Sequence, residues 1–565
     1  MRNKYRRLFP MPAVSRRLLG LAALMLTLYA LFALTSGRAD ESPRSSPGHY
    51  QGYCPRTYRG MECSSQYLTM RDGVRIAMDV YLPKGLKPGE KLPTILEQTR
   101  YGRRFDFRPP FRWFLNNTPH YAELFVTHGY AWVKLDVRGS GASFGNVAYP
   151  WSVDEIKDGG EVVDWIIGQP WSDGKVGSTG VSYMGEASEF LLVNEHPAVK
   201  AIAPYCAFWE AYNDIAFPGG VYLSWFVPTW SRLGIKLDRN DFSGPPFQWY
   251  VPLAVRGFAS VDGDNDRVLL NQAIASHHTI DLTAGTSGEG YRDDQPSGTA
   301  RLSQGLSPAV IGEVQRTFKA GLGGIALVNP ALHKEEIEAS GAAIYSVDGW
   351  FDGAYIRGAI ERYVSLRNPH KLIIGPWIHG VPRNVAGGEK FDIGSELLRF
   401  FDFELRGIQN GVMSEAPITY YTMGEEKWKT ASTWPLPNQT TVAYYFSNNH
   451  TLSVSKPSEP DESDSYVVDN SVGTGHQTRW EPLMGDETAG GSSILNYGDR
   501  SEADKKLLVY DTAPLRADTE VTGHPIVTLY VASSANDGYF FAYLEDVAPS
   551  GRVDYVTEGA AARDQ

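Results

Sequence analysis

The amino-acid sequence predicts an α/β fold, with parallel strands and crossover helices, followed by an all-β region. Three observations lead to this prediction. Short β-branched or aromatic runs alternate with amphipathic segments of helical length between residues 74 and 205. The same alternation resumes between residues 342 and 405. Beyond residue 411, short alternating runs recur without helices between them, which is typical of a β-sandwich or jelly roll.

The first part of the α/β core is expected over residues 40–205. Its predicted strands end at turn residues and are Val74–Tyr81, Thr94–Gln98, Trp132–Asp136 and Val176–Thr179. One predicted helix, Asp154–Ile167, stops before Gln169-Pro170, where proline ends a helix. A second predicted helix is Met184–Asn194.

Residues 206–335 interrupt the alternation and predict a helical cap inserted into the core. Aromatic residues crowd Phe208–Tyr212 and Tyr222–Trp230, and the rest has the character of helices and loops. The second part of the core, residues 336–411, then offers two strands and two helices: Ala342–Val347, Tyr355–Leu366, Lys371–Gly375 and Ser395–Leu405. Residues 412–565 are the expected jelly roll, with strands at Ile418–Thr422, Thr441–Phe446, Leu507–Tyr510 and Ile526–Ala532.

Residues 1–39 have the pattern of an export signal. A basic segment precedes the apolar run Leu18–Leu34, and small residues follow that run. The run is near the lower length limit for crossing a bilayer, so an uncleaved membrane anchor is the alternative. Ser15–Leu19 weakly resembles a twin-arginine signal. We therefore expect a periplasmic or extracellular protein.

Charge and cysteine content exclude some classes of function. The net charge of -12 argues against nucleic acid as a partner, because phosphate binding needs a concentrated cationic surface. Cys54 and Cys63 lie close together, and either a small disulfide loop or two free thiols explains them. Cys206 is expected to be an unpaired core thiol. No Cys/His cluster has zinc spacing, so neither a metal nor a cofactor is predicted.

The strongest chemical signal is Gly180-Val181-Ser182-Tyr183-Met184-Gly185, between a short predicted strand and a predicted helix. A nucleophilic serine must project from a tight strand-to-helix turn, where glycines avoid collisions with neighbouring backbone. Such a turn also directs helix N-terminal amides at the substrate, so the Tyr183 N–H is a candidate oxyanion donor. Glycine-flanked serines are common by chance, and the surrounding sequence must support this one.

A serine nucleophile needs a base and an acid that orients the base. Asp352 follows the predicted strand Ala342–Val347, and His379 follows Lys371–Gly375. This Ser, Asp, His order at the C-terminal ends of strands is that of α/β hydrolases. Asp348 competes with Asp352 but has the context of a turn residue. His277-His278 follows no predicted strand.

Other candidate residues are more ambiguous from the residues alone. Tyr101 lies in the loop after an early strand, where a second oxyanion donor is expected, although packing is the stronger interpretation. Phe208, Trp209 and Trp225 are candidates for an apolar acyl pocket, with core packing again the stronger interpretation.

Together these motifs resemble the cocaine-esterase/X-Pro dipeptidyl-peptidase family, which also contains glutaryl acylases and α-amino-acid ester hydrolases. The serine turn, the Gly-Trp-Phe-Asp segment and the Gly-Pro-Trp-Ile-His segment carry the resemblance, with Met70–Arg75, Asp79–Pro83, Asp136–Gly141, Trp171–Gly177 and Phe401–Gly411. It implies Ser182, Asp352 and His379 as the triad, with the Tyr101 hydroxyl and the Tyr183 amide in the oxyanion hole. It also implies an α/β-hydrolase core, a helical cap and a galactose-binding-like jelly roll.

Some features depart from parts of that family. The α-amino-acid ester hydrolases have an acidic residue where this chain has Met184, and X-Pro peptidases have an extra N-terminal domain. The chain also ends before the family's jelly roll would, so we expect a truncated C-terminal domain.

The predicted function is hydrolysis of a small-molecule carboxylic ester or amide by acyl transfer. An X-Pro dipeptidyl-peptidase or amidase activity is one alternative, and an inactive carbohydrate- or surface-binding protein is another. A homodimer formed through exposed cap and jelly-roll surfaces stays open.

Overall fold

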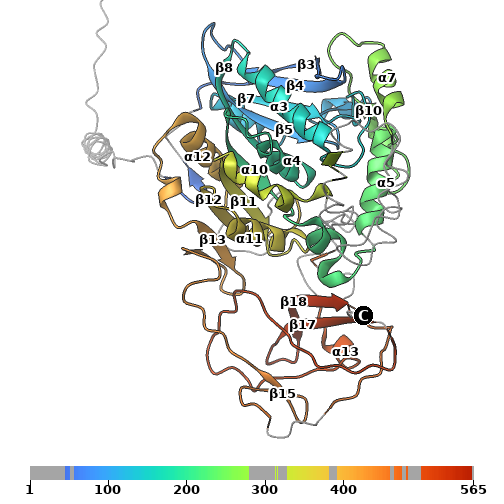
Figure 1. Ribbon diagram of the computed structural model, residues 1–565, viewed down its shortest axis with the longest axis vertical. Helices are drawn as coiled ribbons and strands as arrows, with labels where there is room; N and C mark the ends of the chain where they lie inside the picture. Colours follow the sequence, from blue (N-terminus) through green and yellow to red (C-terminus); the bar gives the residue numbers. More distant parts are fainter. Residues whose placement is uncertain are drawn as a thin grey trace, which may run out of the picture.

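A mixed ten-stranded sheet forms the centre of the molecule (Figure 1). The computed structural model describes residues 45–50, 56–224, 226–278, 312–313, 315, 327–380, 391–457, 463–473, 479–480, 498–536 and 538–562. The strand order is β14-β13-β12-β11-β9-β8-β5-β7-β4-β3. The strands are β3 Met61–Thr69, β4 Arg75–Pro83, β5 Leu92–Thr99, β7 Ala131–Asp136, β8 Ser172–Val181, β9 Val199–Tyr205, β11 Ala343–Gly349, β12 His370–Gly375, β13 Ile418–Thr422 and β14 Lys427–Ala431.

The inner strands run parallel, and the sheet ends in antiparallel pairs. Strands β7, β5, β8, β9, β11, β12 and β13 are parallel neighbours. The pairs β3–β4, β4–β7 and β13–β14 are antiparallel. Parallel pairing brings the C-terminal ends of the inner strands to one edge, where an open α/β sheet builds its site. The α/β prediction and the strands predicted for the core are confirmed to within a few residues.

Helices cover both faces of this sheet. Since side chains alternate between the faces along each strand, neighbouring residues of one strand pack against helices on opposite faces. On β5, Leu96 packs with helices α3 (Val153–Ile167) and α4 (Tyr183–Leu192), whereas its neighbour Ile95 packs with α2 (Ala122–Thr127) and α12 (Ile393–Arg406). Helix α11 (Tyr355–Ser365) lies against β11 and β12, and α10 (Lys334–Ala339) lies against α4. The predicted helices of the core are thereby confirmed.

The segment after β9 is rich in short helices. It contains the π-helix η2 (Tyr212–Ala216), the 3-10 turn η3 (Pro218–Gly220) and the helices α5 (Phe226–Asp238), α6 (Val251–Ala254) and α7 (Val268–Ser276). Strand β10 (Val255–Phe258) pairs with β6 (Phe105–Phe107), so this segment also joins the loop that follows β5. Residues 279–311 and 316–326 of the expected cap lie outside the described residues.

The C-terminal region lies below the sheet in Figure 1 and is β-rich. Its described ladders are β15 (Tyr445–Ser447) with β16 (Thr451–Ser453), and β17 (Tyr539–Val547) with β18 (Val553–Ala562). A short helix, α13 (Ser501–Asp504), accompanies them. This confirms a β-rich domain, while the jelly-roll topology and the predicted domain boundaries stay predictions.

Three predicted C-terminal strands need correction. Ile418–Thr422 does not belong to the C-terminal sheets but forms β13, which extends the central sheet next to β12. Leu507–Tyr510 and Ile526–Ala532 are not regular strands, although their residues favour the extended conformation. A strand exists only where a neighbour completes its hydrogen bonds, and alternation in a sequence does not identify that neighbour.

Residues 1–44, which hold the predicted export signal, lie outside the described residues. Among the residues that the structure describes, no helix has both the length and the apolar character needed to cross a membrane.

Candidate active site

Ser182 lies at the turn between β8 and α4, in a strained backbone conformation. Its φ of 60° and ψ of -130° fall outside the regions that non-glycine residues favour. A Cβ atom on Gly180 would lie 2.2 Å from the Cβ of Met184, so only glycine fits there. The Ser182 N–H donates to the Tyr205 carbonyl at 2.9 Å, which fixes the turn to β9. Ser182 therefore has the geometry predicted for a nucleophile.

Tyr183 begins α4, and its side chain is fixed in the core. Its hydroxyl donates to Glu155 at 2.6 Å, and Trp151 stacks on its ring with centroids 4.4 Å apart. The Trp151 indole N–H also donates to the Tyr183 carbonyl at 3.2 Å. Because the first N–H groups of a helix have no intrahelical acceptor, the Tyr183 N–H is available beside Ser182. Burial raises the pKa of Glu155 to about 7.

Tyr101 is half-buried on the loop after β5, and its ring lies beside that of Tyr183, with centroids 6.0 Å apart. The same hydroxyl accepts a hydrogen bond from the Trp230 indole N–H at 2.9 Å. Burial raises the pKa of Tyr101, so the hydroxyl keeps its proton. The hydroxyl thus has a proton to donate, and its role as a second oxyanion donor stays a prediction.

Asp352 and His379 meet at the C-terminal ends of β11 and β12. The His379 Nδ1 lies 2.8 Å from the Asp352 Oδ2, and Asp352 is completely buried. Asp348 lies at the end of β11, where its carboxylate accepts the Gly349 N–H at 2.7 Å. Burial and the neighbouring Asp352 charge raise the pKa of Asp348 well above its ordinary value. Asp352, rather than Asp348, is thus the partner of His379.

Tyr355 is a site residue that the sequence did not reveal. Its ring stacks on His379 with centroids 4.6 Å apart, and it stacks on Phe208 with centroids 6.3 Å apart. Tyr355 therefore lies against the candidate base, and within the described part of the chain no hydrogen bond joins Ser182 to His379. Its position three residues after Asp352, at the start of α11, was the available signal.

Cys206 lies close to both Asp352 and His379. One potential ligand atom each from Cys206, Asp352 and His379 lies within 4.8 Å of the others, a grouping with metal-ligand chemistry that no sequence spacing revealed. Burial and the nearby carboxylates raise the pKa of the thiol well above its ordinary value. Cys206 is therefore a neutral, unpaired core thiol, as expected. Cys63 is exposed on β3, and Cys54 lies outside the described residues, so the choice between a disulfide loop and two free thiols stays open.

The three residues predicted to line an acyl pocket receive different outcomes. Phe208 is buried, and its ring packs between Trp151 and Tyr355 at 5.4 and 6.3 Å. Trp209 is buried, and its backbone N–H donates to Asp214 at 2.9 Å. Trp225 lies outside the described residues. Phe208 therefore borders the site through Tyr355, and an acyl-binding role for these residues stays a prediction.

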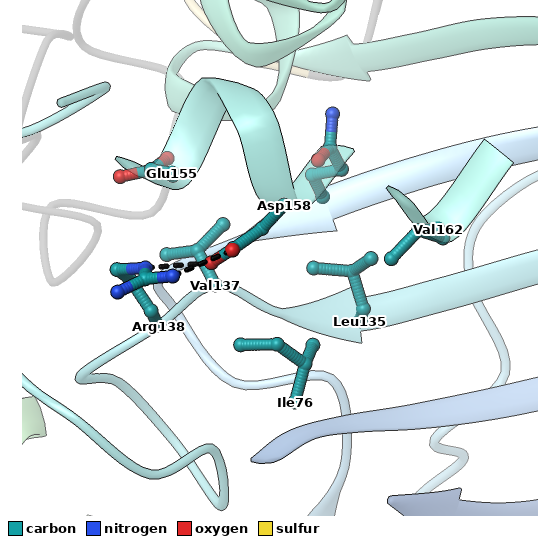
Figure 2. Close-up of a pocket in the computed structure, with 8 residues that line it drawn as sticks. Ile76, Leu135, Val137, Arg138, Glu155, Asp158 and Val162 are labelled. Carbon is teal, nitrogen blue, oxygen red and sulfur yellow. Dashed lines mark hydrogen bonds and ion pairs between the residues drawn. The ribbon is translucent and has the colours of Figure 1, made fainter. Parts of the chain in front are cut away.

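Two further contacts support the site from outside. The Gly353 N–H, next to Asp352, donates at 3.1 Å to the carbonyl of Arg479, so the C-terminal region contacts the segment that carries Asp352. On the opposite side, Figure 2 shows a small cavity beside Glu155 where Arg138 pairs with Asp158 on α3. Both of their hydrogen bonds measure 2.6 Å, and this bidentate pair fixes the loop after β7 to α3.

Two family models match the chain. The model described as X-Pro dipeptidyl-peptidase (S15 family) matches residues 72–247 and 325–381. The model described as the X-Pro dipeptidyl-peptidase C-terminal non-catalytic domain matches residues 410–563.

Similar proteins include named hydrolases. A candidate serine esterase from Mycobacterium bovis is 45% identical over 538 residues, which cover 93% of this chain and 84% of the relative. Cocaine esterase from Rhodococcus sp. is 30% identical over 532 residues, which cover 88% of this chain and 82% of that enzyme.

Two solved structures share the fold over most of the chain. An aminopeptidase from a marine sediment Thaumarchaeota archaeon has a TM-score of 0.60 at 19% identity, covering 93% of this chain and 85% of its own. An α-amino acid ester hydrolase has a TM-score of 0.60 at 20% identity, with the same coverage.

Proposed function

Because the chain belongs to the cocaine esterase/X-Pro dipeptidyl-peptidase family of serine hydrolases, we propose that it hydrolyses carboxylic esters through an acyl-enzyme on Ser182. One observation carries this proposal: a strained serine after β8 lies at the same edge of the parallel sheet as the His379–Asp352 pair, which follows β11 and β12. Relatives named as esterases, at 45% and 30% identity, favour an ester over an amide.

In the first step, the Ser182 hydroxyl attacks the substrate carbonyl carbon while His379 takes the hydroxyl proton. Asp352 accepts a hydrogen bond from His379 Nδ1 and stabilises the imidazolium that forms. The Tyr183 N–H and the Tyr101 hydroxyl would donate to the oxyanion. The alcohol then leaves with the proton from His379.

In the second step, water replaces the alcohol. His379 removes a proton from this water, which attacks the acyl carbonyl and regenerates the Ser182 hydroxyl as the acid leaves. The buried walls around Asp352 keep the His379–Asp352 pair away from bulk water, where the interaction would be weaker.

Fluorophosphonate labelling tests the nucleophile. Wild-type protein should label and hydrolyse a short-chain p-nitrophenyl ester, whereas Ser182→Ala should not label and should lose at least about 10³-fold in kcat. Ser188→Ala is a matched control on the same helix, since its hydroxyl donates to the Gly185 carbonyl at 2.6 Å. Equal labelling of Ser182→Ala and wild type would exclude Ser182 as the nucleophile.

A second candidate function is X-Pro dipeptidyl-peptidase or amidase activity. The match to the S15 family model favours it, and the triad would serve either bond. Rates on an acyl p-nitrophenyl ester and on an X-Pro p-nitroanilide, measured with one preparation, separate the two. A larger kcat/KM for the anilide would replace the esterase proposal with the peptidase.

We also propose that the protein is exported. The basic residues before Leu18 and the apolar run to Leu34 support this proposal. Cell fractionation, with the N-terminal mass of the mature chain, tests it. A cytoplasmic chain with an intact N-terminus would contradict export, while an intact chain in the membrane fraction would identify an anchor.

A further inference from the structure

Helix α5 presents one face to the loop that carries Tyr101. Trp230, Gly234 and Asp238 are spaced four residues apart and therefore lie on the same side of α5. The Trp230 indole N–H donates to the Tyr101 hydroxyl at 2.9 Å, and Asp238 accepts a hydrogen bond from Arg100 Nη2 at 3.3 Å. The α5 face thus holds two consecutive residues of the loop after β5.

Gly234 makes room for this contact. A Cβ atom at Gly234 would lie 3.0 Å from the Arg100 Nη2, in the middle of the α5 face. The Arg100 guanidinium also lies over the Trp230 ring at 5.1 Å and near the Tyr183 ring at 5.9 Å. Arg100 therefore links α5 to both residues that would supply oxyanion donors, Tyr101 through its own loop and Tyr183 through its ring.

The direction of the Trp230 hydrogen bond matters for catalysis. An indole N–H is a donor only, so the Tyr101 oxygen must accept in this bond. The Tyr101 proton must then point away from the indole, and the Tyr101 ring lies beside the Tyr183 ring, which directly follows Ser182, with centroids 6.0 Å apart. The oxygen of a substrate carbonyl attacked by Ser182 would be next to this hydroxyl. Without Trp230, the hydroxyl could rotate and act as an acceptor instead.

We propose that Trp230 is a positioning residue whose indole N–H fixes the Tyr101 hydroxyl as a donor to the substrate carbonyl oxygen. The Arg100–Asp238 ion pair holds α5 against the loop in the register that this bond requires. The oxyanion hole is then shared between the core, which supplies both donors, and the helical segment after β9, which orients one of them. This inference rests on the proposed esterase function.

A double-mutant cycle tests the proposal. Trp230→Phe keeps an aromatic ring but removes the N–H, and loss of one neutral hydrogen bond should lower kcat by about 2- to 12-fold. Tyr101→Phe should lower kcat by about 10²-fold. In the Tyr101→Phe background, Trp230→Phe should have no further effect, because the hydroxyl through which it acts is gone.

If Trp230→Phe lowers kcat by the same factor in the wild-type protein and in the Tyr101→Phe variant, the proposal is overturned and Trp230 is a packing residue. A series of acyl sizes gives an independent readout. We expect Trp230→Phe to lower kcat by the same factor for acetyl, butyryl and hexanoyl esters. An increase in KM that grows with acyl length would overturn the proposal. Fluorophosphonate labelling of Ser182 in each variant keeps the two questions apart, since labelling tests the esterase proposal alone.

Two further variants guard against misfolding. Asp238→Asn weakens the Arg100 pair without touching Tyr101, and its kcat loss should likewise vanish in the Tyr101→Phe background. If Asp238→Asn still lowers kcat in the Tyr101→Phe background, the Arg100–Asp238 ion pair does not act through Tyr101, and its proposed role is overturned. Trp249→Phe removes an indole N–H from a ring that is 77% exposed and should leave kcat unchanged. Near-identical melting temperatures across the set would confirm that the variants fold.

Discussion

The serine side and the base side of the candidate site are fixed by different forces. The serine side is fixed by steric contacts: Gly180 leaves no space for a Cβ, and aromatic rings surround Tyr183. The base side, around His379, is fixed by the buried polar groups of Asp352, Asp348 and Cys206. Tyr355 stacks on His379 and, through Phe208 and Trp151, is linked to the Tyr183 ring.

This difference teaches where each side is vulnerable. The serine side should fail when volume is added, since its backbone has no room to relax. The base side should fail when charge or hydrogen bonding is changed, because unpaired polar groups in a buried site are costly. The variants below separate these two sensitivities.

The largest effect is expected at the base side. Asp352→Asn should lower kcat by about 10³- to 10⁴-fold, because the amide cannot stabilise the imidazolium or fix the correct tautomer. Asp348→Asn is the matched control: burial and the neighbouring Asp352 charge raise the pKa of the Asp348 carboxyl, which favours its neutral form, so the amide isostere should keep kcat within about threefold. Steady-state rates on one p-nitrophenyl ester provide the measurement. Equal losses for both variants would contradict the assignment of Asp352 as the partner of His379.

Added volume at the serine side should have the next largest effect. Gly180→Ala places a methyl group 2.2 Å from the Met184 Cβ, so the turn must shift and kcat/KM should fall by about 10²-fold. Gly60→Ala meets nothing within 4 Å and serves as the control for a glycine-to-alanine change. Activity and melting temperature should both fall in Gly180→Ala alone. Full activity in that variant would show that the turn tolerates displacement.

A smaller loss is expected where the two sides meet. Tyr355→Phe keeps the ring against His379 but removes the hydroxyl, and loss of one hydrogen bond should lower kcat by about 2- to 12-fold. Tyr363→Phe, on the same helix, should leave kcat unchanged. A loss above 10³-fold in Tyr355→Phe would instead make its hydroxyl part of the catalytic machinery.

The smallest expected effect is a pH dependence of stability on the serine side. Burial raises the pKa of Glu155 from its ordinary value of 4.5 to about 7. Between these values the folded protein holds a proton that the unfolded chain releases, so stability falls as pH rises from about 4.5 to 7. Glu155→Gln cannot titrate, so its melting temperature minus that of wild type should rise by a few degrees between pH 5 and pH 8. A difference independent of pH would contradict the raised pKa.

The candidate triad could be predicted because each of its residues lies in a short local motif. Ser182 lies between glycines that the turn requires, and Asp352 and His379 each follow a β-branched strand, so their meeting at one sheet edge follows from parallel pairing. Sequence context also distinguishes Asp352 from the competing Asp348, and Asp352 is the residue whose carboxylate lies 2.8 Å from the His379 Nδ1.

The remaining features depend on long-range contacts that no local pattern records. Trp230 is 129 positions from Tyr101 in the sequence, and only the packing of α5 on the loop after β5 brings them together. Cys206 approaches Asp352 because β9 and β11 are neighbours in the sheet. The prediction of Ile418–Thr422 as a jelly-roll strand is wrong for the same reason, since strand character does not specify a partner.

Trapping the acyl-enzyme tests the central claim most directly. The protein should be mixed with a slowly deacylating p-nitrophenyl ester, quenched in acid, digested and analysed by mass spectrometry. The account predicts one acyl adduct on the peptide that contains Ser182, formed with a burst of p-nitrophenol and absent from Ser182→Ala. An adduct on another residue, or full turnover by Ser182→Ala, would contradict it.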